Sequence, residues 1–143
     1  MTVDELMTPT VVTCAPDDTL NRAAQLLWER DCGCLPVVAD GSLIGMLTDR
    51  DICMAAYTKG RALHEIRVDE IMSTDVKSCI RTDSIEAVQT LMQMHQLRRV
   101  PVVDQDKLIG IISLTDLRIR PVEATLAAGS RPRQRAAARA VTA

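Results

Sequence analysis

The chain has 143 residues, of which 47% are hydrophobic and 25% charged, enough to bury the core of one compact unit or of two small packed ones. Residues 1–117 carry 11 Lys/Arg against 18 Asp/Glu, and the chain has one Trp, one Tyr and no Phe, which argues against nucleic-acid binding. No apolar run reaches the length of a membrane span and no secretory leader is visible, so we expect a cytoplasmic protein whose five cysteines are reduced.

The positions of proline, turn and capping residues, together with the spacing of apolar residues, predict the elements of the first half of the chain. The opening helix ends before Thr8-Pro9, because a residue that precedes proline is pushed out of the helical region. Asp18 or Thr19 caps the next helix, and the turn 39–42 joins two apolar strands into a hairpin. In chain order we expect a helix at 3–7, a strand at 11–14, a helix to about residue 30, strands at 35–38 and 43–47, and a helix from 49.

The chain is a tandem repeat. With an offset of 65, residues 3–52 align without a gap on residues 68–117, and fifteen of the fifty aligned positions are identical, including Pro-Val-Val and Leu-Ile-Gly. We therefore expect the same elements twice. The expected division is a first unit at 1–60, a polar linker at 61–67, a second unit at 68–121, and a mobile basic Ala/Arg-rich tail at 122–143.

Each repeat places a hydroxyl and a carboxylate three residues apart where a strand gives way to a helix. These pairs are Thr48 with Asp51 and Ser113 with Asp116. One interpretation is a capping box, in which the side chains satisfy the first amides of the helix. The other is a ligand site, in which the hydroxyl and the helix amides hold a phosphate and the carboxylate accepts hydrogen bonds from a ribose diol. Both can hold at once, since a hydroxyl donates one hydrogen bond and accepts others.

Two copies of Leu-Pro-Val-Val or its equivalent, a turn, Leu-Ile-Gly, a hydroxyl and an aspartate resemble the cystathionine-β-synthase (CBS) domain, and the pair resembles a stand-alone CBS-pair (Bateman) module. The resemblance covers about residues 1–121. It implies an α/β (α+β) fold of two tandem units, each a small mixed sheet with flanking helices, packed with pseudo-two-fold symmetry around two clefts. It also implies adenine-nucleotide ligands, with AMP, ADP, ATP or a related adenosyl compound as a regulator, and a homodimer.

The resemblance also assigns residues to the two clefts. Asp51 and Asp116 would hold ribose hydroxyls, and Thr48 and Ser113 would contact ribose or phosphate. The base pocket and the phosphate partners complete the set: Thr13, Ser78, Leu35 and Val100 would line the base pockets, and Arg50 and Arg118 are either phosphate partners or solvated surface arginines.

The cysteines allow a second, metal-based hypothesis. Cys14 and Cys79 occupy equivalent strand positions and are expected to be small buried hydrophobes. Cys32 and Cys34 have one residue between them, and the repeat places His95 at the corresponding helix end of the other copy. A zinc or thiol-redox site built from Cys32, Cys34 and His95 is the minority hypothesis, because this spacing differs from that of common zinc knuckles.

The residues show no catalytic Ser/His/acid set and no Gly-rich phosphate loop. We therefore expect no enzyme and no required cofactor, but a regulatory module that binds an adenosine-containing nucleotide in one or both clefts and acts in trans on an unidentified protein partner. Two alternatives stay open: a ligand-free, stress-associated interaction protein, and the zinc or thiol sensor. The arginines of the tail are either solvated or contact an acidic partner or nucleic acid.

Overall fold

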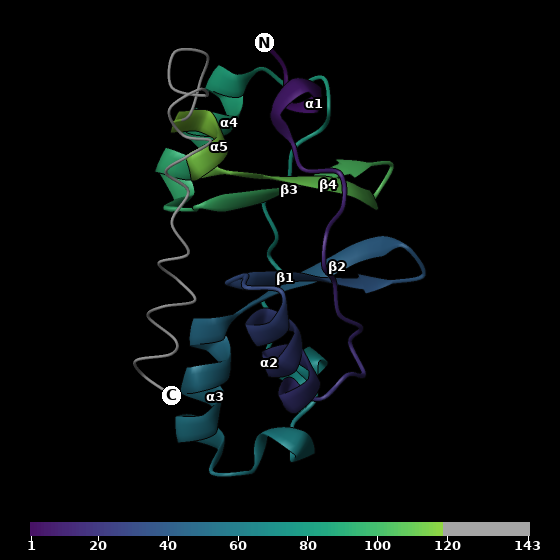
Figure 1. The fold of residues 1–143 in the computed structure, drawn as a ribbon, viewed down its shortest axis with the longest axis vertical. Helices are drawn as coiled ribbons and strands as arrows, with labels where there is room; N and C mark the ends of the chain where they lie inside the picture. The colour runs from purple at the N-terminus through teal and green to yellow at the C-terminus, as the bar shows by residue number, and fades with distance from the viewer. Residues whose placement is uncertain (119–143) are drawn as a thin grey trace.

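The computed structural model describes residues 1–118, so the expectations for residues 119–121 and for the tail lie outside the described residues. Within this range two β-hairpins face each other, and helices cover the outer side of each (Figure 1). Strands β1 (Cys34–Ala39) and β2 (Ser42–Thr48) form the first hairpin, and β3 (Arg99–Asp104) and β4 (Lys107–Ser113) the second. Both hairpins predicted from the sequence are therefore present.

The two hairpins have matching turns and matching irregularities. Asp40 and Gly41 have φ values of 53° and 81°, which gives a two-residue turn whose twist matches that of the flanking strands. Gln105 and Asp106 repeat this with φ values of 50° and 69°. The register slips by one residue after Val37 in the first hairpin and after the corresponding Val102 in the second. The local geometry thus follows the repeat closely.

The hairpins join into one four-stranded sheet in the order β1-β2-β4-β3. The pairing between β2 and β4 is antiparallel at Ser42 and Lys107. The Lys107 ammonium also donates a hydrogen bond of 2.6 Å to the carbonyl oxygen of Asp40. The strand pairing between the two hairpins is therefore narrow and lies at their turn ends.

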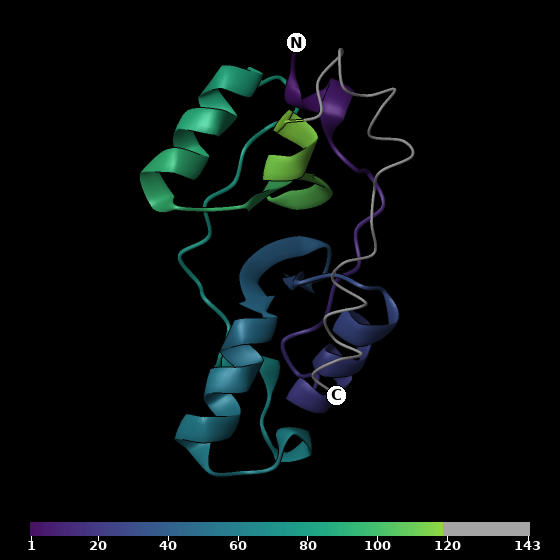
Figure 2. The same cartoon turned by 60° about the vertical axis from the view of Figure 1, so that its left-hand side comes forward.

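Helices α2 (Leu20–Glu29) and α3 (Asp49–Lys59) pack their apolar faces on the first hairpin, and α4 (Ile85–His95) and α5 (Leu114–Arg118) pack theirs on the second (Figure 2). Thr19 and Ser84 cap the second helix of each repeat, and each accepts a hydrogen bond of 3.1 Å from a backbone amide of the first turn. The helical elements are α1 (Val3–Leu6), α2 (Leu20–Glu29), α3 (Asp49–Lys59), α4 (Ile85–His95) and α5 (Leu114–Arg118), with short 3-10 turns η1 (Leu63–Glu65) and η2 (Val68–Glu70).

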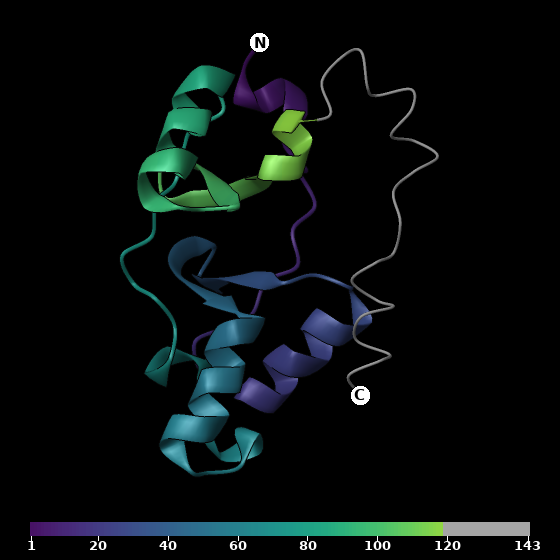
Figure 3. The ribbon, with the colours of Figure 1, turned by 90° about the vertical axis from the view of Figure 1, so that its left-hand side faces the viewer.

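The opening segment of each repeat packs into the other unit. Val3 has no exposed surface and belongs to the hydrophobic cluster of α4, β3 and β4. Val68, its counterpart in the second repeat, lies in the cluster of α2, β1 and β2, together with Ile66. The two connecting segments run along opposite sides of the sheet (Figure 3). The two cores are therefore built from both repeats.

Backbone hydrogen bonds also link the opening segment of each repeat to the other unit, and they occur in equivalent pairs. The Val3 amide donates to the carbonyl of Asp83 at 3.0 Å, and the Val68 amide donates to the carbonyl of Asp18 at 2.8 Å. The amide of Thr8 similarly donates to Ile111 in β4 at 2.8 Å. Because the bonds are equivalent under the 65-residue offset, the pseudo-two-fold symmetry includes the crossing segments.

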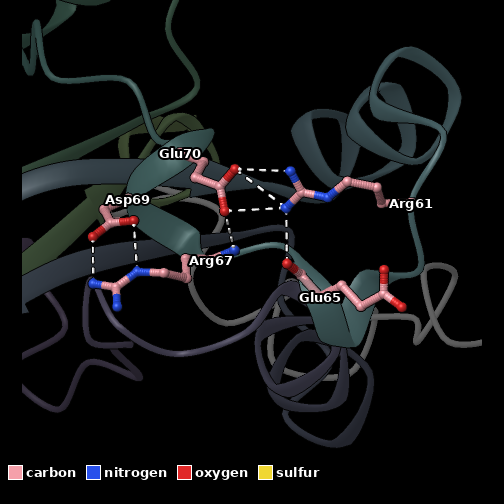
Figure 4. Close-up of polar contacts among 5 residues, drawn as sticks. All are labelled: Arg61, Glu65, Arg67, Asp69 and Glu70. Carbon is pink, nitrogen blue, oxygen red and sulfur yellow. Dashed lines mark hydrogen bonds and ion pairs between the residues drawn. The ribbon is translucent and has the colours of Figure 1, made fainter.

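An exposed ion-pair network supports the crossing segment at 61–70 (Figure 4). Arg61 donates to the Glu65 carbonyl at 2.8 Å and to the Glu70 carboxylate at 3.3 Å. The Glu70 carboxylate also accepts a hydrogen bond from the Arg67 amide, which lowers the pKa of Glu70. The Arg67 guanidinium is 2.7 Å from Asp69; this hydrogen bond lowers the pKa of Asp69 and raises that of Arg67. The network connects the segment 61–67, expected to be a polar linker, to the start of the second repeat.

The strand expected at 11–14 is reduced to an isolated parallel bridge between Cys14 and Val37. The Cys14 amide donates to the Pro36 carbonyl, and the Val38 amide donates back to Cys14. Extending the ladder toward Val12 would require an amide hydrogen on residue 36, which proline lacks. Pro101 stands at the equivalent place, and the second repeat shows the same single bridge, between Cys79 and Val102.

Candidate functional site

The hydroxyl–carboxylate pairs do form capping boxes. Thr48 ends β2 and is the N-cap of α3; its hydroxyl oxygen accepts a 3.1 Å hydrogen bond from the Asp51 amide, and its own amide donates to Asp51 Oδ2 at 2.9 Å. Ser113 and Asp116 make the same two bonds, at 3.1 and 2.8 Å. The capping interpretation is therefore confirmed in both repeats.

Capping leaves ligand-binding capacity at these pairs. A hydroxyl that accepts one hydrogen bond still has a proton to donate, and a carboxylate has a second oxygen. Within residues 1–118 no hydrogen bond involves Asp51 Oδ1, and the Thr48 hydroxyl donates none. Both side chains are half-buried, so they remain open to a molecule that enters from solvent.

The Thr48–Asp51 pair lines a cavity of about 620 Å³, which we call the first cleft. One side consists of the end of β2, the start of α3, and Gly33 and Cys34 at the start of β1. The other side belongs to the second repeat and consists of Ser73, the segment 75–77, the loop 96–98 and the start of β3. Its volume lies within the range of small-molecule sites, about 300–1,000 Å³. The first cleft thus joins the two repeats and can hold a nucleotide-sized ligand.

Basic side chains are concentrated in the first cleft. Arg50 comes from the first turn of α3, Lys77 from the segment before Cys79, and Arg98 and Arg99 from the start of β3. Lys77 forms an ion pair of 3.1 Å with Asp75, which also lines the cleft. Among residues 1–118, Arg50, Arg98 and Arg99 form no ion pair with a carboxylate.

Of the predicted site residues, Thr48, Arg50 and Asp51 come together in the first cleft. Leu35 and Val100 do not line it: both have no exposed surface and belong to the two hydrophobic clusters. Successive side chains of a strand point to opposite faces. The residues that line the first cleft are instead their neighbours, namely Cys34 in β1 and Arg99 and Pro101 in β3.

The other predicted residues are spread more widely. Thr13 is half-buried in the segment before Cys14. Ser78 lines a separate, smaller cavity of about 190 Å³, which also contains Thr74 and Asp106. Arg118 is exposed at the end of α5, the last described residue. The roles given to Ser113, Asp116, Thr13, Ser78 and Arg118 in ligand binding stay predictions.

Sequence reasoning did not find the second-repeat side of the first cleft. Lys77, Arg98 and Arg99 precede or begin apolar strands, where a basic residue is easily taken for an ordinary surface residue. The 65-residue repeat shows which elements are equivalent, but not that the start of α3 faces the start of β3. The sequence feature that could have indicated this side of the cleft is the pair of adjacent arginines, Arg98 and Arg99, in an otherwise acidic part of the chain.

The metal hypothesis is not supported within the described chain. No group of three or more His, Cys, Asp or Glu side chains able to hold a metal ion occurs among residues 1–118. Cys34 is buried beside the first cleft, Cys32 is half-buried, and His95 is exposed at the end of α4. The three residues therefore do not form a shared metal site here.

Cys14 and Cys79 are buried, as predicted, at equivalent places in the two cores. Burial raises the pKa of each thiol from 9.0 to about 12, with a further contribution from Asp18 at Cys14 and from Asp83 at Cys79. Thiols held in the protonated state are poor nucleophiles and poor metal ligands. In this structure the pair serves to pack the strands.

The described residues contain no helix with the length and apolar character needed to cross a bilayer.

Comparison with known proteins places the repeats in one family: the CBS domain model matches residues 3–57 and 68–123. The chain is 43% identical over 117 residues to the CBS domain-containing protein YhcV of Bacillus subtilis (strain 168), a match that covers 82% of this chain and 83% of the relative.

Solved structures give the same result. Hypoxic Response Protein I, whose crystal structure holds two coordinated zinc ions, aligns with a TM-score of 0.75 and 33% identity over 82% of this chain and 97% of that one. The crystal structure of CBSX2 in complex with AMP aligns with a TM-score of 0.74 and 28% identity, covering 87% and 96%. The two matched repeats, their symmetric packing and these relatives agree: the chain belongs to the CBS domain family, as a tandem CBS pair.

Proposed function

We propose that this CBS pair is a non-enzymatic regulatory module that binds an adenosine-containing ligand in the first cleft. The carrying observation is that one cavity of about 620 Å³ contains the Thr48–Asp51 pair on one side and the second repeat on the other. A related CBS protein of known structure, CBSX2, binds AMP. In this proposal the free oxygen of Asp51 accepts hydrogen bonds from the ribose diol, and the Thr48 hydroxyl donates to the ligand.

The position of the first cleft gives a mechanism for regulation. A ligand there contacts the start of α3 in one repeat and the start of β3 in the other, whereas the sheet joins the repeats at the single pair Ser42 and Lys107. A ligand shifts an equilibrium between two arrangements only through its different affinity for them. We propose that occupancy favours one relative arrangement of the two units, which a partner protein recognises in trans. A homodimer of the module is part of the same proposal.

Titration calorimetry and thermal shift with AMP, ADP, ATP, NAD and S-adenosylmethionine test this function. A ligand at 100 times its Kd adds about 2.7 kcal/mol of apparent stability. Asp51→Asn keeps an acceptor for the Thr48 amide while removing the negative charge, so it separates ligand binding from capping. Asp116→Asn is the matched control in the other repeat.

If Asp51→Asn loses the ligand-induced thermal shift and Asp116→Asn retains it, the result supports the first cleft as the binding site. If a folded wild-type protein responds to none of the five ligands, the adenosyl-ligand function is wrong. The ligand-free interaction protein then becomes the better description. Zinc is not proposed as a ligand, because residues 1–118 offer no group of three ligating side chains.

A further inference from the structure

A methionine of each repeat lies against a glycine of the other repeat. A Cβ on Gly45 would be 2.7 Å from Met72 Sδ, and a Cβ on Gly110 would be 2.7 Å from Met7 Sδ. The two methionines are equivalent under the 65-residue offset, and so are the two glycines. The two thioethers therefore lie at the contact between the units, where the chain after α1 passes β4 and the chain after η2 passes β2.

The sulfur of Met72 has no room for a further atom on its glycine side. The space that a Cβ of Gly45 would take is 3.0 Å from Met72 Cγ and 3.1 Å from the Ser73 carbonyl oxygen. The amides of Ser73 and Met46 donate to each other's carbonyl oxygens, at 2.9 and 3.0 Å. An oxygen atom on this side of the sulfur would therefore find neither space nor a donor in these two amides.

The contact in the other unit has the same form. The space of a Cβ on Gly110 is 3.2 Å from Met7 Cγ and 3.0 Å from the Thr8 carbonyl oxygen. The amides of Thr8 and Ile111 donate to each other's carbonyl oxygens, at 2.8 and 3.0 Å. In both units the residue after the methionine thus holds its segment on the strand through two hydrogen bonds, directly beside the contact of sulfur and glycine.

The Met72 contact adjoins the first cleft. Ser73, the next residue along the chain, and Met46, its partner in β2, both line that cleft. A change that displaces Met72 from Gly45 therefore acts on a wall of the first cleft through one peptide unit.

The seven methionines differ in their access to solvent. Met94 is 71% exposed and Met92 is 2% exposed, whereas Met7 and Met72 are half-buried. A small oxidant modifies an exposed thioether first, and a fully buried one only when the protein opens. Met7 and Met72 combine partial access with a close contact between the two units.

The relevant reaction is oxidation of the thioether by a peroxide. A lone pair of the sulfur attacks one peroxide oxygen, the O–O bond breaks, and the sulfur–oxygen bond of a sulfoxide forms. The proton of the transferred oxygen passes to the departing hydroxide, which leaves as water. The sulfur loses two electrons, the peroxide gains them, and the side chain becomes polar and larger. A sulfoxide cannot keep the apolar contact with the glycine, so the side chain turns outward or its segment separates from the strand.

We propose that Met7 and Met72 are a pair of oxidation sites, at which a peroxide forms the sulfoxide and so loosens the contact between the two units. At Met72 the same event loosens a wall of the first cleft. The modification is reversible, because enzymes that reduce methionine sulfoxide restore the thioether. The inference goes beyond the proposed function and does not depend on it, since its test needs no ligand.

The test treats the full chain with increasing hydrogen peroxide and follows each methionine by peptide mass spectrometry. The exposed Met54 and Met94 are oxidised first, without a change in the thermal unfolding midpoint. Met7 and Met72 follow, and the midpoint falls by at least about 5 °C as they are modified. Reduction by a methionine sulfoxide reductase returns the midpoint to its starting value.

Hydrogen exchange locates the change. The amides of Ser73 and Met46 lose protection when Met72 is oxidised, and those of Thr8 and Ile111 lose it when Met7 is oxidised. Protection within α2, whose residues contact neither methionine's glycine, is retained at this stage.

Two double variants make the test specific. Met7→Leu with Met72→Leu keeps the apolar volume and removes both oxidisable sulfurs, so its midpoint stays within about 1 °C on peroxide treatment. Met54→Leu with Met94→Leu is the matched control and falls as the wild type does. Both variants keep Met46 and all five cysteines, so oxidation elsewhere affects them equally.

Met72→Gln gives a second measurement without an oxidant. A polar side chain at this place lowers the midpoint of the untreated protein, whereas Met94→Gln, at an exposed position, leaves it unchanged. Circular dichroism before treatment shows that each variant is folded.

Three results would overturn the proposal. In the first, Met7 and Met72 resist peroxide until the protein unfolds, which shows that their sulfurs are not accessible. In the second, both are oxidised and the midpoint does not change. In the third, the variant with leucine at both positions loses as much stability on treatment as the wild type, which assigns the sensitivity to another residue.

Discussion

Gly45 of β2 lies so close to Met72, two residues after the crossing segment at 61–70, that a Cβ on Gly45 would be 2.7 Å from Met72 Sδ. The Ser73 carbonyl oxygen would be 3.1 Å away and belongs to the backbone. Gly110 repeats this contact in the other unit, where a Cβ would be 2.7 Å from Met7 Sδ. The Leu-Ile-Gly sequence of each repeat therefore has a glycine because the exchanged segment passes directly over it.

Gly45→Ala is expected to destabilise the fold by about 1–3 kcal/mol, because the crossing segment must move away from β2. Gly110→Ala should behave alike. Urea unfolding measures the change. Gly60→Asn is a suitable control: Gly60 has a φ of 62°, a Cβ on it would meet nothing within 4 Å, and asparagine tolerates that conformation. A Gly45→Ala variant as stable as the wild type would show that the contact is not tight.

Val3→Ala is expected to destabilise the unit formed by the second repeat by about 2 kcal/mol, because Val3 is fully buried in that core. Hydrogen exchange should then show weaker protection in α4, while α2 keeps its protection. Asp4→Ala, at an exposed neighbour, should change stability by less than about 0.5 kcal/mol. Weakened protection in α2 alone would contradict the exchange of segments.

Thr48→Ala is expected to cost about 1 kcal/mol of stability in the absence of ligand, because α3 loses its N-cap. Thr48→Ser keeps the hydroxyl and should retain most of that stability. Ser113→Ala provides the equivalent measurement in the second repeat. Thermal unfolding of the unliganded variants checks the effect, and an unchanged midpoint in Thr48→Ala would show that another group caps the helix.

The buried thiols make stability depend on pH in the alkaline range. In the unfolded chain Cys14 and Cys79 ionise near pH 9.0, whereas in the folded protein burial raises their pKa to about 12. The unfolded state therefore releases these protons first, and their contribution to stability is complete below pH 9 and declines as the pH rises toward 12.

The urea midpoint of reduced protein is accordingly expected to fall between pH 8.5 and about pH 10.5. Replacing Cys14 and Cys79 by alanine should make this decline shallower. Alkylation at pH 8 followed by mass spectrometry gives an independent check: the exposed Cys53 should be modified in the folded protein, and the two buried thiols only after unfolding. Rapid modification of Cys14 in folded protein would be inconsistent with its burial.

Local features could be predicted from the sequence because local residues decide them. Asp40-Gly41 is a residue pair that favours a two-residue hairpin turn, and Thr48 and Asp51 are three residues apart, so their hydrogen bonds do not depend on distant packing. The repeat extended these predictions to the second half of the chain. Both hairpins and both capping boxes were therefore within reach of sequence reasoning.

The second-repeat side of the first cleft could not be predicted from the sequence, because it depends on how one repeat faces the other. Leu35 and Val100 are predicted from their place before Pro-Val-Val, but the strand face that a residue occupies decides between core and cleft. A prediction shifted by one position selects Cys34 and Arg99, which line the cavity. The exchange of opening segments could not be predicted either. The local sequences around Val3 and Val68 are nearly the same, and they do not indicate which of the two cores each residue enters.

The exchange of opening segments also bears on how such a chain could arise. A single copy of the repeat has one opening segment and one core, and in this geometry the segment reaches only the core of another copy. Two separate copies would complete each other as an intertwined pair whose formation depends on concentration. Duplication within one gene tethers the copies, which replaces that dependence by a high effective local concentration. Once tethered, the copies are free to diverge in sequence.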